Sequence, residues 1–443
     1  MFHLLSLTVG SRKSCSVKNT SPSESLIVAL LATILPATFW TLNNVSTIQA
    51  QTQTATSAIV ADNDDSNDGL RPWLNHPEGT VRFATFNTAM NRDKEGQLLE
   101  ELSTGSNEQA QQLAQIIQCV RPDVLLICEI DRDPEQKALD VFHDLYLAES
   151  QGELQPIEFA YRYFAESNTG IPSTVDFNNN GKSDEADDAF GFGQFPGKYA
   201  MAVLSKFPIE ENSIRSYQKF LWTSMPNANW PVNPETKNAY YSPTAGKVFR
   251  LSSKSHWLLP IATAQGTIYF AAAHPTPPVF DGPEDRNGLR NHDEIRLLAD
   301  ALDESRGDYL VDDNGTRGGL PKNAKFIVAG DMNADPNDGD SSLNAIDQLL
   351  NHPLIDASHL PTSIGGQQTS QRQGKINLKH KGPAKADTSD FNDNRVGNLR
   401  LDYVLPSKTL KVISAGVFWP ADSLPEHTLV QASDHRLVWI DVK

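Results

Sequence analysis

The sequence predicts a globular α/β domain built from layers of strands and helices. Of the 443 residues, 39% are hydrophobic and 8% are aromatic, which is enough for a substantial buried core. Short β-rich runs recur from residue 80 to the C-terminus, and segments with apolar residues three and four positions apart lie between some of them. Strands mixed with helices in this way indicate a layered α/β domain.

The expected elements form one domain over residues 80–443, because no repeat of constant period and no break in composition interrupts this range. Most of the expected strands are apolar enough to be buried. Strands are expected at VRFATF (81–86), DVLLICEI (123–130), YAMAVLS (199–205), GTIYFAAAH (266–274), KFIVAGD (325–331), LRLDYVLP (399–406) and HRLVWIDV (435–442). Helices are expected at EQAQQLAQIIQCV (108–120) and RNHDEIRLLADAL (290–302).

Three long stretches, 150–197, 211–247 and 361–398, look like insertions into this domain. They are rich in Pro, Gly, Asn and aromatic residues, and loops of that length inside a compact domain are usually functional or disordered. We therefore expect substrate choice to reside in them. Residues 51–79, which precede the domain, are polar and acidic, as in a linker.

The first 50 residues have the order of a secretory signal. Arg12 and Lys13 precede an apolar run at 26–42, and a polar stretch ends at the small residue Ala50. The alternative is an uncleaved membrane anchor, although Pro36 interrupts a run that is already short for a spanning helix. Under either interpretation the sequence predicts export to the periplasm or the extracellular space.

The net charge of −17 makes this an acidic protein. Proteins that bind long nucleic acids without sequence preference usually present a basic face, because release of counterions from the phosphates dominates their affinity. The charge therefore counts against long polynucleotide substrates. It does not exclude them, since a metal cluster can supply positive charge locally.

Only three cysteines occur, and Cys15 lies in the predicted signal. Cys119 ends an apolar helical segment and Cys128 lies in an apolar strand. Such positions are typical of buried free thiols, so the sequence predicts no disulfide framework.

Polar side chains follow several of the expected strands, where a buried strand has no structural need for them. They are Asn87, Glu129, His274, Asp331 and Asn333. Ligands and catalytic groups gather at strand ends in α/β sheets, because loops leave a rigid scaffold there. The pattern therefore predicts one active site at the ends of these strands.

Glu129 follows a run of apolar residues, so loss of hydration would penalise its charge unless a cation compensates. A bound metal is one such cation, and an ion pair with Arg132 or Lys137 is the alternative. Asp331 and Asn333 are two residues apart, so both side chains face one way in an extended backbone. A carboxylate and an amide suit orientation of water and stabilisation of negative charge, although GDMNAD could also be a simple turn.

Two further acidic residues and a histidine lie near the C-terminus. Asp402 falls within an alternating strand, and Asp434 and His435 immediately precede the last strand. A buried carboxylate that accepts a hydrogen bond from a histidine fixes its tautomer and favours its charged form. Asp402 is the candidate for that role toward His435, with a surface turn as the alternative explanation of the Asp-His pair.

Taken together, FNTAMN, LICEI, AAHPTPP, GDMNADP, RLDYVLPS and SDHRLVW resemble, in order and spacing, the motifs of the endonuclease/exonuclease/phosphatase superfamily over residues 80–443. The resemblance implies a four-layer α/β sandwich of two mixed sheets with helices outside. It also implies hydrolysis at phosphorus with the help of Mg²⁺, Mn²⁺ or Ca²⁺.

The resemblance assigns roles to residues of this chain. Glu129 is similar to the principal metal ligand, assisted by Asn87 and Asp434. Some nucleases of the superfamily carry an acidic residue where this chain has Ala89, which puts a second metal position in doubt.

The catalytic side chains follow from the same resemblance. Asp331 and Asn333 are similar to the pair that orients the attacking water and holds phosphoryl oxygens. His435, oriented by Asp402, is similar to the histidine that contacts the scissile phosphate. His274 is similar to the second histidine of deoxyribonuclease-like members.

Two segments outside these motifs carry further candidates. DFNNNGKSDEAD matches the spacing of a calcium loop, with Asp in place of the final Glu, which predicts a structural Ca²⁺ site; a solvated acidic loop is the alternative. Its candidate ligands are Asp176, Asn178, Asn180, Lys182, Asp184 and Asp187. Guanidinium groups bind phosphate with two hydrogen bonds, so Arg286 and Arg290, with His292, are candidate substrate ligands; ion pairs with neighbouring acidic residues are the alternative.

The sequence therefore predicts a secreted, metal-dependent phosphoesterase acting on a small or lipid-linked phosphate ester, with no stable protein partner. A secreted nuclease is the second hypothesis, because it would use the same core residues. An inactive calcium-binding extracellular module is the third. Lys254 and His256 form a polar cluster that is suggestive only.

Overall fold

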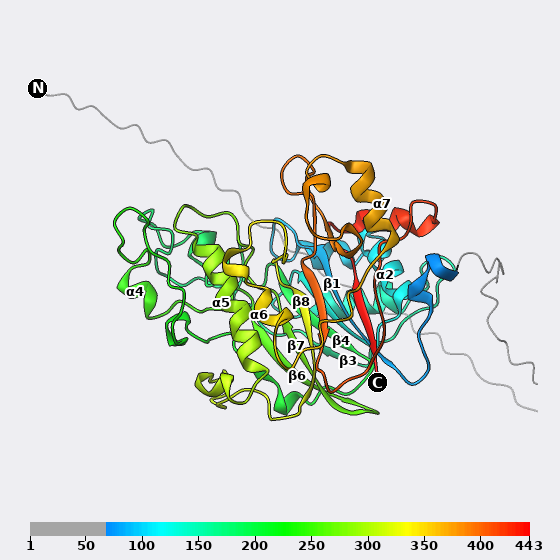
Figure 1. Cartoon of the computed structure of the whole chain (residues 1–443), viewed down its shortest axis with the longest axis horizontal. Helices are drawn as coiled ribbons and strands as arrows, with labels where there is room; N and C mark the ends of the chain where they lie inside the picture. Colours follow the sequence, from blue (N-terminus) through cyan, green and yellow to red (C-terminus); the bar gives the residue numbers. More distant parts are fainter. Residues whose placement is uncertain (1–67) are drawn as a thin grey trace, which may run out of the picture. The chain divides into compact units, whose positions relative to one another are not determined.

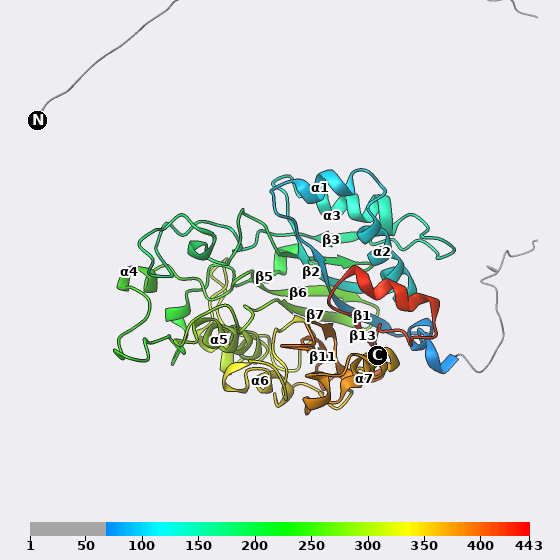
Figure 2. The same cartoon turned by 90° about the horizontal axis from the view of Figure 1, so that it is seen from above.

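The computed structural model describes residues 68–443, so the predicted signal at 1–50 lies outside the described residues. Two mixed β-sheets pack face to face and helices cover their outer faces, which confirms the predicted four-layer α/β sandwich (Figure 2). Within the described range, no helix has both the length and the apolar character that crossing a bilayer requires.

The first sheet has six strands in the order β12-β13-β1-β2-β4-β3. Their bounds are β1 (Val81–Met90), β2 (Val124–Ile130), β3 (Tyr161–Tyr163), β4 (Ala200–Ser205), β12 (Val412–Val417) and β13 (Val438–Val442). Strands β1 and β2 run parallel, and the other neighbouring pairs run antiparallel.

The second sheet has five strands in the order β11-β8-β7-β6-β5. Their bounds are β5 (Arg215–Ser216), β6 (His256–Thr263), β7 (Gly266–Ala273), β8 (Lys325–Asp331) and β11 (Asp402–Pro406). Strands β7 and β8 run parallel and the other pairs antiparallel. A short antiparallel pair, β9 (Ser389–Asp390) and β10 (Asn398–Leu399), lies at the end of the 361–398 insertion.

The helices lie outside the two sheets (Figures 1 and 2). Their bounds are α1 (Gln97–Leu102), α2 (Glu108–Val120), α3 (Lys137–Phe142), α4 (Pro243–Gly246), α5 (Arg286–Ala301), α6 (Asp347–Leu350) and α7 (Ile364–Gln373). Helices α1 to α3 pack on the first sheet, and α5 and α6 pack on the second. Helix α2 has its predicted bounds, whereas α5 begins four residues before the predicted start at residue 290.

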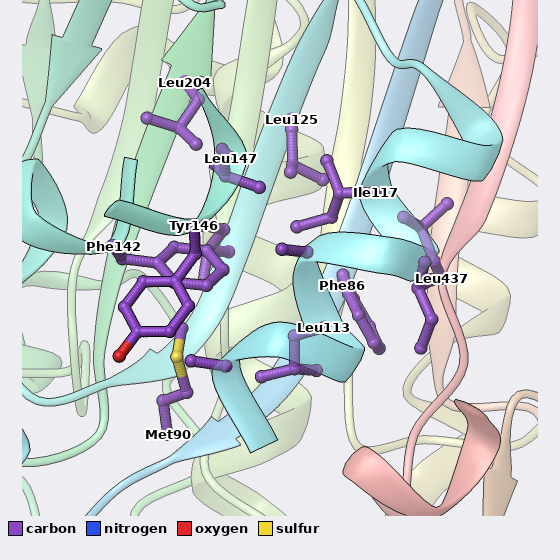
Figure 3. Packing of buried hydrophobic residues seen from close by; sticks show 14 of the residues in the cluster. Phe86, Met90, Leu113, Ile117, Leu125, Phe142, Tyr146, Leu147, Leu204 and Leu437 are labelled. Atoms are coloured by element: carbon purple, nitrogen blue, oxygen red, sulfur yellow. The ribbon is translucent and has the colours of Figure 1, made fainter. Parts of the chain in front are cut away.

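Successive side chains of a strand point to opposite faces of its sheet, so each strand contributes to two separate hydrophobic cores. In β1, Phe83 faces the second sheet, where its ring centroid lies 5.7 Å from that of Phe270. Phe86 faces the opposite way and packs with Leu113 and Ile117 of α2 (Figure 3). One strand therefore supplies both the core between the sheets and the core under the helices.

Strand β6 was not predicted, because it contains Pro260, and proline cannot donate a ladder hydrogen bond. The structure tolerates it near an edge of the sheet, since β5 pairs with only Trp257 and Leu258. Beyond these residues the carbonyl of Pro260 accepts a hydrogen bond from the Glu210 N–H (2.9 Å). Strand β5 does not reach Pro260, so the N–H group that proline lacks is not required for pairing with it.

The domain begins earlier than the predicted boundary at residue 80. Trp73 is buried and lies 4.8 Å from Phe418 between ring centroids, so the last part of the predicted 51–79 linker belongs to the packed domain. Cys119 and Cys128 are buried and free, as predicted.

Candidate active site

Strands from both sheets bring polar residues to one edge of the sandwich. Strands β1, β2, β7 and β8 end there, and β11 and β13 begin there because they run antiparallel to β8 and β1. In the register of β8 and β11, Asp331 lies opposite Asp402. An amide from the first sheet reaches the second, since Asn87 Nδ2 donates to Asp331 Oδ2 (3.1 Å). The predicted strand-end site is therefore formed by residues of both sheets.

The backbone at this edge is strained in two places. The pairing of β1 with β2 shifts register between Asn87 and Met90, and the pairing of β2 with β4 shifts between Cys128 and Ile130. Ala89 (φ 49°) and Glu129 (φ 58°) adopt left-handed conformations within these irregularities. Residues other than glycine hold such conformations at a cost of order 1–3 kcal/mol each, typically where a bulge aims a functional side chain.

Glu129 accepts hydrogen bonds from two amides and no cation. Asn87 Nδ2 lies 3.2 Å from its Oε1, and Asn91 Nδ2 lies 2.9 Å from its Oε2. Arg132 donates to a backbone carbonyl, and Lys137 pairs with another glutamate, so neither proposed ion pair forms. Burial raises the pKa of Glu129, because removal from water disfavours the charged carboxylate.

Asp331 lies at the centre of the site. Its Oδ2 is 3.5 Å from His274 Nε2 and 3.7 Å from His435 Nε2, in addition to the Asn87 amide. Its Oδ1 accepts the backbone N–H of Asn333 (2.9 Å), which fixes the direction of the carboxylate. Burial raises the pKa of Asp331, so this carboxylate is more basic than an exposed one.

His435 and Asp402 form the predicted pair. His435 Nδ1 lies 2.8 Å from Asp402 Oδ2, which also accepts from the hydroxyl of Thr388 (2.8 Å). Burial disfavours the charged imidazole, but Asp402 and Asp331 outweigh it and raise the pKa of His435 to about 10. Nε2 is thereby held as a charged donor. The ring of Phe391 packs edge-on against this imidazole, with 5.6 Å between centroids.

Lys254 and His274 also lie at the site, and their pKa values are lowered, whereas that of His435 is raised. Lys254 is buried, and burial lowers its pKa, with Glu129 and Asp331 acting in the opposite direction. Burial also lowers the pKa of His274 well below its usual value, and its Nδ1 has no hydrogen-bond partner in residues 68–443. His274 is therefore neutral. Lys254 lies on the wall of the site, a role that sequence analysis did not assign to it.

These groups open into a cavity of about 800 Å³. Of the predicted catalytic and metal-binding residues, Glu129, His274, Asp331, Asn333, Asp434 and His435 line it. Asn178 and Asp187 of the predicted calcium loop, and Arg286 and Arg290, line it as well. Each predicted insertion also contributes: Phe192 comes from 150–197, Tyr241 from 211–247 and Phe391 from 361–398. That substrate choice resides in the insertions stays a prediction.

Two of the predicted phosphate ligands are used elsewhere. Arg290 lines the cavity, but its guanidinium donates to the backbone carbonyls of Leu251 (2.9 Å), Phe190 (2.6 Å) and Arg250 (3.0 Å). His292 does not line the cavity; its Nδ1 lies 3.0 Å from Asp293 Oδ1 and 3.0 Å from the Asn229 amide. Both side chains are therefore engaged with groups of the protein, and a contact of either with phosphate stays a prediction.

Arg286 also lines the cavity, and its guanidinium pairs with Glu284. The side chain of Arg286 is 18% exposed, so part of it remains accessible. The sequence left open an ion pair with Asp285, Asp293 or Glu294, and the partner in the structure is Glu284 instead. A contact of Arg286 with substrate phosphate stays a prediction as well.

The segment 176–187 folds back on itself in the manner expected of a calcium loop. The Asp176 carboxylate accepts the N–H groups of Asn180 (3.2 Å) and Gly181 (2.8 Å), and Gly181 turns with φ 87°. The carboxylates of Asp184 and Asp187 do not join Asp176 in a three-ligand group, because the single such group in residues 68–443 is Asp331, Asp402 and His435. Calcium binding here stays a prediction.

The residues at the catalytic edge fit a divalent cation. Glu129 is a carboxylate between two amides with no ion pair in the described chain, and Asp402 Oδ1 is buried without a hydrogen-bond partner. Carboxylate and amide oxygens are the ligands that Mg²⁺ and Ca²⁺ prefer. Glu129, Asn87 and the exposed Asp434 could hold the ion, whereas Asp402 and His435 are engaged with each other.

A comparison with models of protein families matches residues 84–435 to the Endonuclease/Exonuclease/phosphatase family. The chain belongs to this family. Its members hydrolyse phosphoester bonds, so the protein is a hydrolase of that class. The matched range runs from three residues before Asn87 to His435, and therefore includes every residue that the resemblance assigned to catalysis or metal binding. A search of curated proteins gave no match.

Solved structures similar to this member of the family include three bacterial proteins. An endonuclease/exonuclease/phosphatase from Beutenbergia cavernae is 16% identical, with a TM-score of 0.44 over 82% of this chain and 71% of that chain. A mannosyl-6-phosphatase from Bacteroides thetaiotaomicron is 12% identical, with a TM-score of 0.41 over 82% and 99%. Sphingomyelinase C from Streptomyces griseocarneus is 12% identical, with a TM-score of 0.39 over 83% and 99%.

Helix α5 positions the site of this endonuclease/exonuclease/phosphatase family member in a way that the sequence did not reveal. Glu294 is fully buried and accepts the backbone N–H groups of Ser253 and Thr276, both at 2.6 Å. Ser253 adjoins Lys254, and Thr276 lies two residues after His274. The carboxylate therefore ties together the two segments that carry these side chains.

Asn291, one turn earlier in α5, acts in the same way. Its amide donates to the carbonyls of Thr276 (2.8 Å) and Met332 (2.9 Å), and Met332 lies between Asp331 and Asn333. Asn291 and Glu294 occupy the i and i+3 positions of the face that also buries Ile295 and Leu298. Polar residues on an apolar stripe are a signal that could have identified both.

Replacing Glu294 with glutamine is expected to lower kcat about 10- to 100-fold with little change in KM, because an amide N–H₂ would face a backbone N–H and shift the Lys254 and His274 segments. The free energy of unfolding should fall by about 1–3 kcal/mol. Steady-state kinetics at a temperature where both proteins are folded would measure the effect. Glu304→Gln, an exposed carboxylate after the same helix, is the matched control. A drop in stability with kcat unchanged would show that Glu294 supports the fold alone.

Proposed function

We propose that this protein is an exported, divalent-metal-dependent hydrolase of phosphomonoesters or phosphodiesters whose alcohol is small or lipid-linked. The observation that carries the proposal is the convergence of Glu129, Asp331 and His435 on the wall of one cavity, with Asp402 hydrogen-bonded to His435 behind it. Family membership supports phosphoester chemistry. The predicted signal at 1–50, which lies outside the described residues, supports export.

The side chains of this site have separable roles in attack by water on phosphorus. Asp331, whose carboxylate is made more basic by burial, accepts a proton from the water. His435 Nε2 donates to a phosphoryl oxygen, with the imidazole direction fixed by Asp402. Lys254 and the Asn333 amide lie on the same cavity wall and can hold the other oxygens. The P–O bond to water forms as the P–O bond to the alcohol breaks, and the alcohol oxygen takes up the proton that Asp331 received from the water.

The metal belongs beside Glu129, with Asn87 and Asp434 as further ligands. When bound, Mg²⁺ or a similar ion supplies positive charge that offsets the negative charge developing around phosphorus. The protein contributes the orientation of the ligands, since Asn91 and Asn87 hold the two oxygens of Glu129 in place.

Removal of divalent cations tests the metal dependence. Treatment with EDTA is expected to abolish turnover of p-nitrophenyl phosphate and bis-p-nitrophenyl phosphate, and Mg²⁺ should restore it, because Glu129 then regains its counter-charge. Calcium at the 176–187 loop should appear separately, as a rise in Tm with added Ca²⁺. The Asp176→Asn variant should lose that rise and keep Mg²⁺-dependent turnover. Full activity in EDTA would contradict the metal assignment.

The same assay separates the competing functions. A nuclease would cleave DNA or RNA efficiently and leave the small esters intact. An inactive calcium-binding module would show the Ca²⁺-dependent rise in Tm and no turnover of any phosphoester. The net charge of −17 favours small or lipid-linked phosphoesters over nucleic acid as the substrate.

A further inference from the structure

The cavity at the active site is much larger than the groups that react. Its volume of about 800 Å³ is in the range of sites that enclose a whole drug-sized ligand. Glu129, Asp331 and His435 occupy one part of its wall, whereas the remaining wall is formed largely by the three insertions and the segment after His274. Most of the volume is therefore available to the part of the substrate that does not react.

By area the surface of the cavity is mainly apolar, although Asp335, Asp338 and Asp340 also line it. It is lined by Phe177, Phe192, Tyr241, Phe249, Phe280 and Phe391. Phe177 and Phe249 pack with ring centroids 4.5 Å apart, and Tyr241 lies 4.7 Å from Phe249. An apolar ligand that covers these rings gains the free energy of removing its own surface from water.

Two rings at the cavity remain in contact with solvent. Phe192 is 50% exposed and Phe280 is 85% exposed. The exposure of Phe280 is built into the loop: its φ is 66°, the Asn287 amide donates to the adjacent Val279 carbonyl (2.7 Å), and Asp281 accepts the Asn287 N–H (2.7 Å). A fixed, exposed ring beside an apolar cavity is suited to cover a ligand that enters it.

We propose that the alcohol portion of the substrate is bulky and mainly apolar, and that Phe192 and Phe280 contact it at the mouth of the cavity. This inference rests on the proposed phosphoesterase function and narrows its substrate class. A small hydrophilic alcohol would leave these rings in water, and a polynucleotide would place charged phosphates against them.

A series of n-alkyl phosphates tests the proposal. Ethyl, butyl and hexyl phosphate, and the corresponding methyl alkyl phosphodiesters, have leaving groups of similar reactivity, so differences in kcat/KM report on binding of the chain. With Mg²⁺ present, kcat/KM is expected to rise by about fourfold for each methylene that becomes buried. The ratio of hexyl to ethyl ester should then be on the order of 100-fold.

Variants connect that gradient to the rings. Phe280→Ala combined with Phe192→Ala is expected to reduce the hexyl-to-ethyl ratio to about 10-fold or less. Leu378→Ala is the matched control, because Leu378 is 69% exposed and does not line the cavity; its ratio should equal that of the wild type. Thermal unfolding would verify that the variants are folded.

The outcomes separate the inference from the function on which it rests. Turnover of all esters with a flat chain-length profile would overturn the inference and leave the phosphoesterase intact. An unchanged gradient in the double variant would overturn the assignment of Phe192 and Phe280. No turnover of any ester with Mg²⁺, Mn²⁺ or Ca²⁺ would overturn the proposed function and the inference together.

Discussion

Replacement of Glu129 by glutamine is expected to lower kcat/KM by about 10³-fold or more, because a metal contributes several kcal/mol of charge stabilisation to such reactions. The amide keeps the size of the side chain and its place beside Asn87 and Asn91, so packing is preserved. It removes the negative charge that a divalent cation requires. Steady-state kinetics at saturating Mg²⁺ would measure the loss.

The same variant should respond differently to metal in unfolding experiments. Without divalent ions, Glu129→Gln is expected to be at least as stable as the wild type, since burial raises the pKa of Glu129 and penalises its charge. Added Mg²⁺ should stabilise the wild type by about 2.7 kcal/mol at 100 times its Kd, and the variant by much less. Glu135→Gln, an exposed glutamate, is the control. A variant that kept wild-type activity and Mg²⁺ stabilisation would exclude Glu129 as the ligand.

The strands and the strand-end residues could be predicted because each depends on local sequence. Glu129 and Asp331 each end an apolar run with a carboxylate. This pattern can be recognised in the sequence without knowledge of the partner strands. Period-two alternation in VRFATF assigns Phe83 and Phe86 to opposite faces, and the structure places them so. Strand β6 was not predicted because Pro260 interrupts its pattern of strand-forming residues. The proline is tolerated because the short strand β5 does not pair with that part of β6.

The orientation of the side chains in the site could not be predicted, because it depends on backbone conformation and on contacts between residues far apart in the sequence. Nothing in LICEI indicates that Glu129 adopts φ 58°. Thr388 bonds to Asp402 from an insertion whose path the sequence does not specify. The contacts of Arg290 and His292 could not be predicted, because charge alone does not distinguish a side chain that binds phosphate from one that binds backbone carbonyls or a neighbouring carboxylate.

Replacement of His435 by glutamine is expected to lower kcat by about 10²- to 10⁴-fold, because a positioned, charged donor to the phosphoryl oxygen is lost. Replacement of Asp402 by asparagine should lower it by about 10²-fold. The amide can still accept from Nδ1, but the carboxylate that favours the charged imidazole is gone. Both variants are measured at saturating Mg²⁺ with a single phosphate ester.

The double variant decides whether the two residues act as one unit. If Asp402 works only through His435, then the double variant should lose no more activity than His435→Gln alone, within about threefold, whereas independent roles would multiply the two losses. The surface pair His359 and Asp356, 3.3 Å apart, provides a matched control cycle with no expected loss. A multiplicative result would assign Asp402 a contact of its own, through the Oδ1 atom that no group in residues 68–443 satisfies. That atom would then join the candidate metal ligands, and the Mg²⁺ stabilisation of Asp402→Asn would fall below that of the wild type.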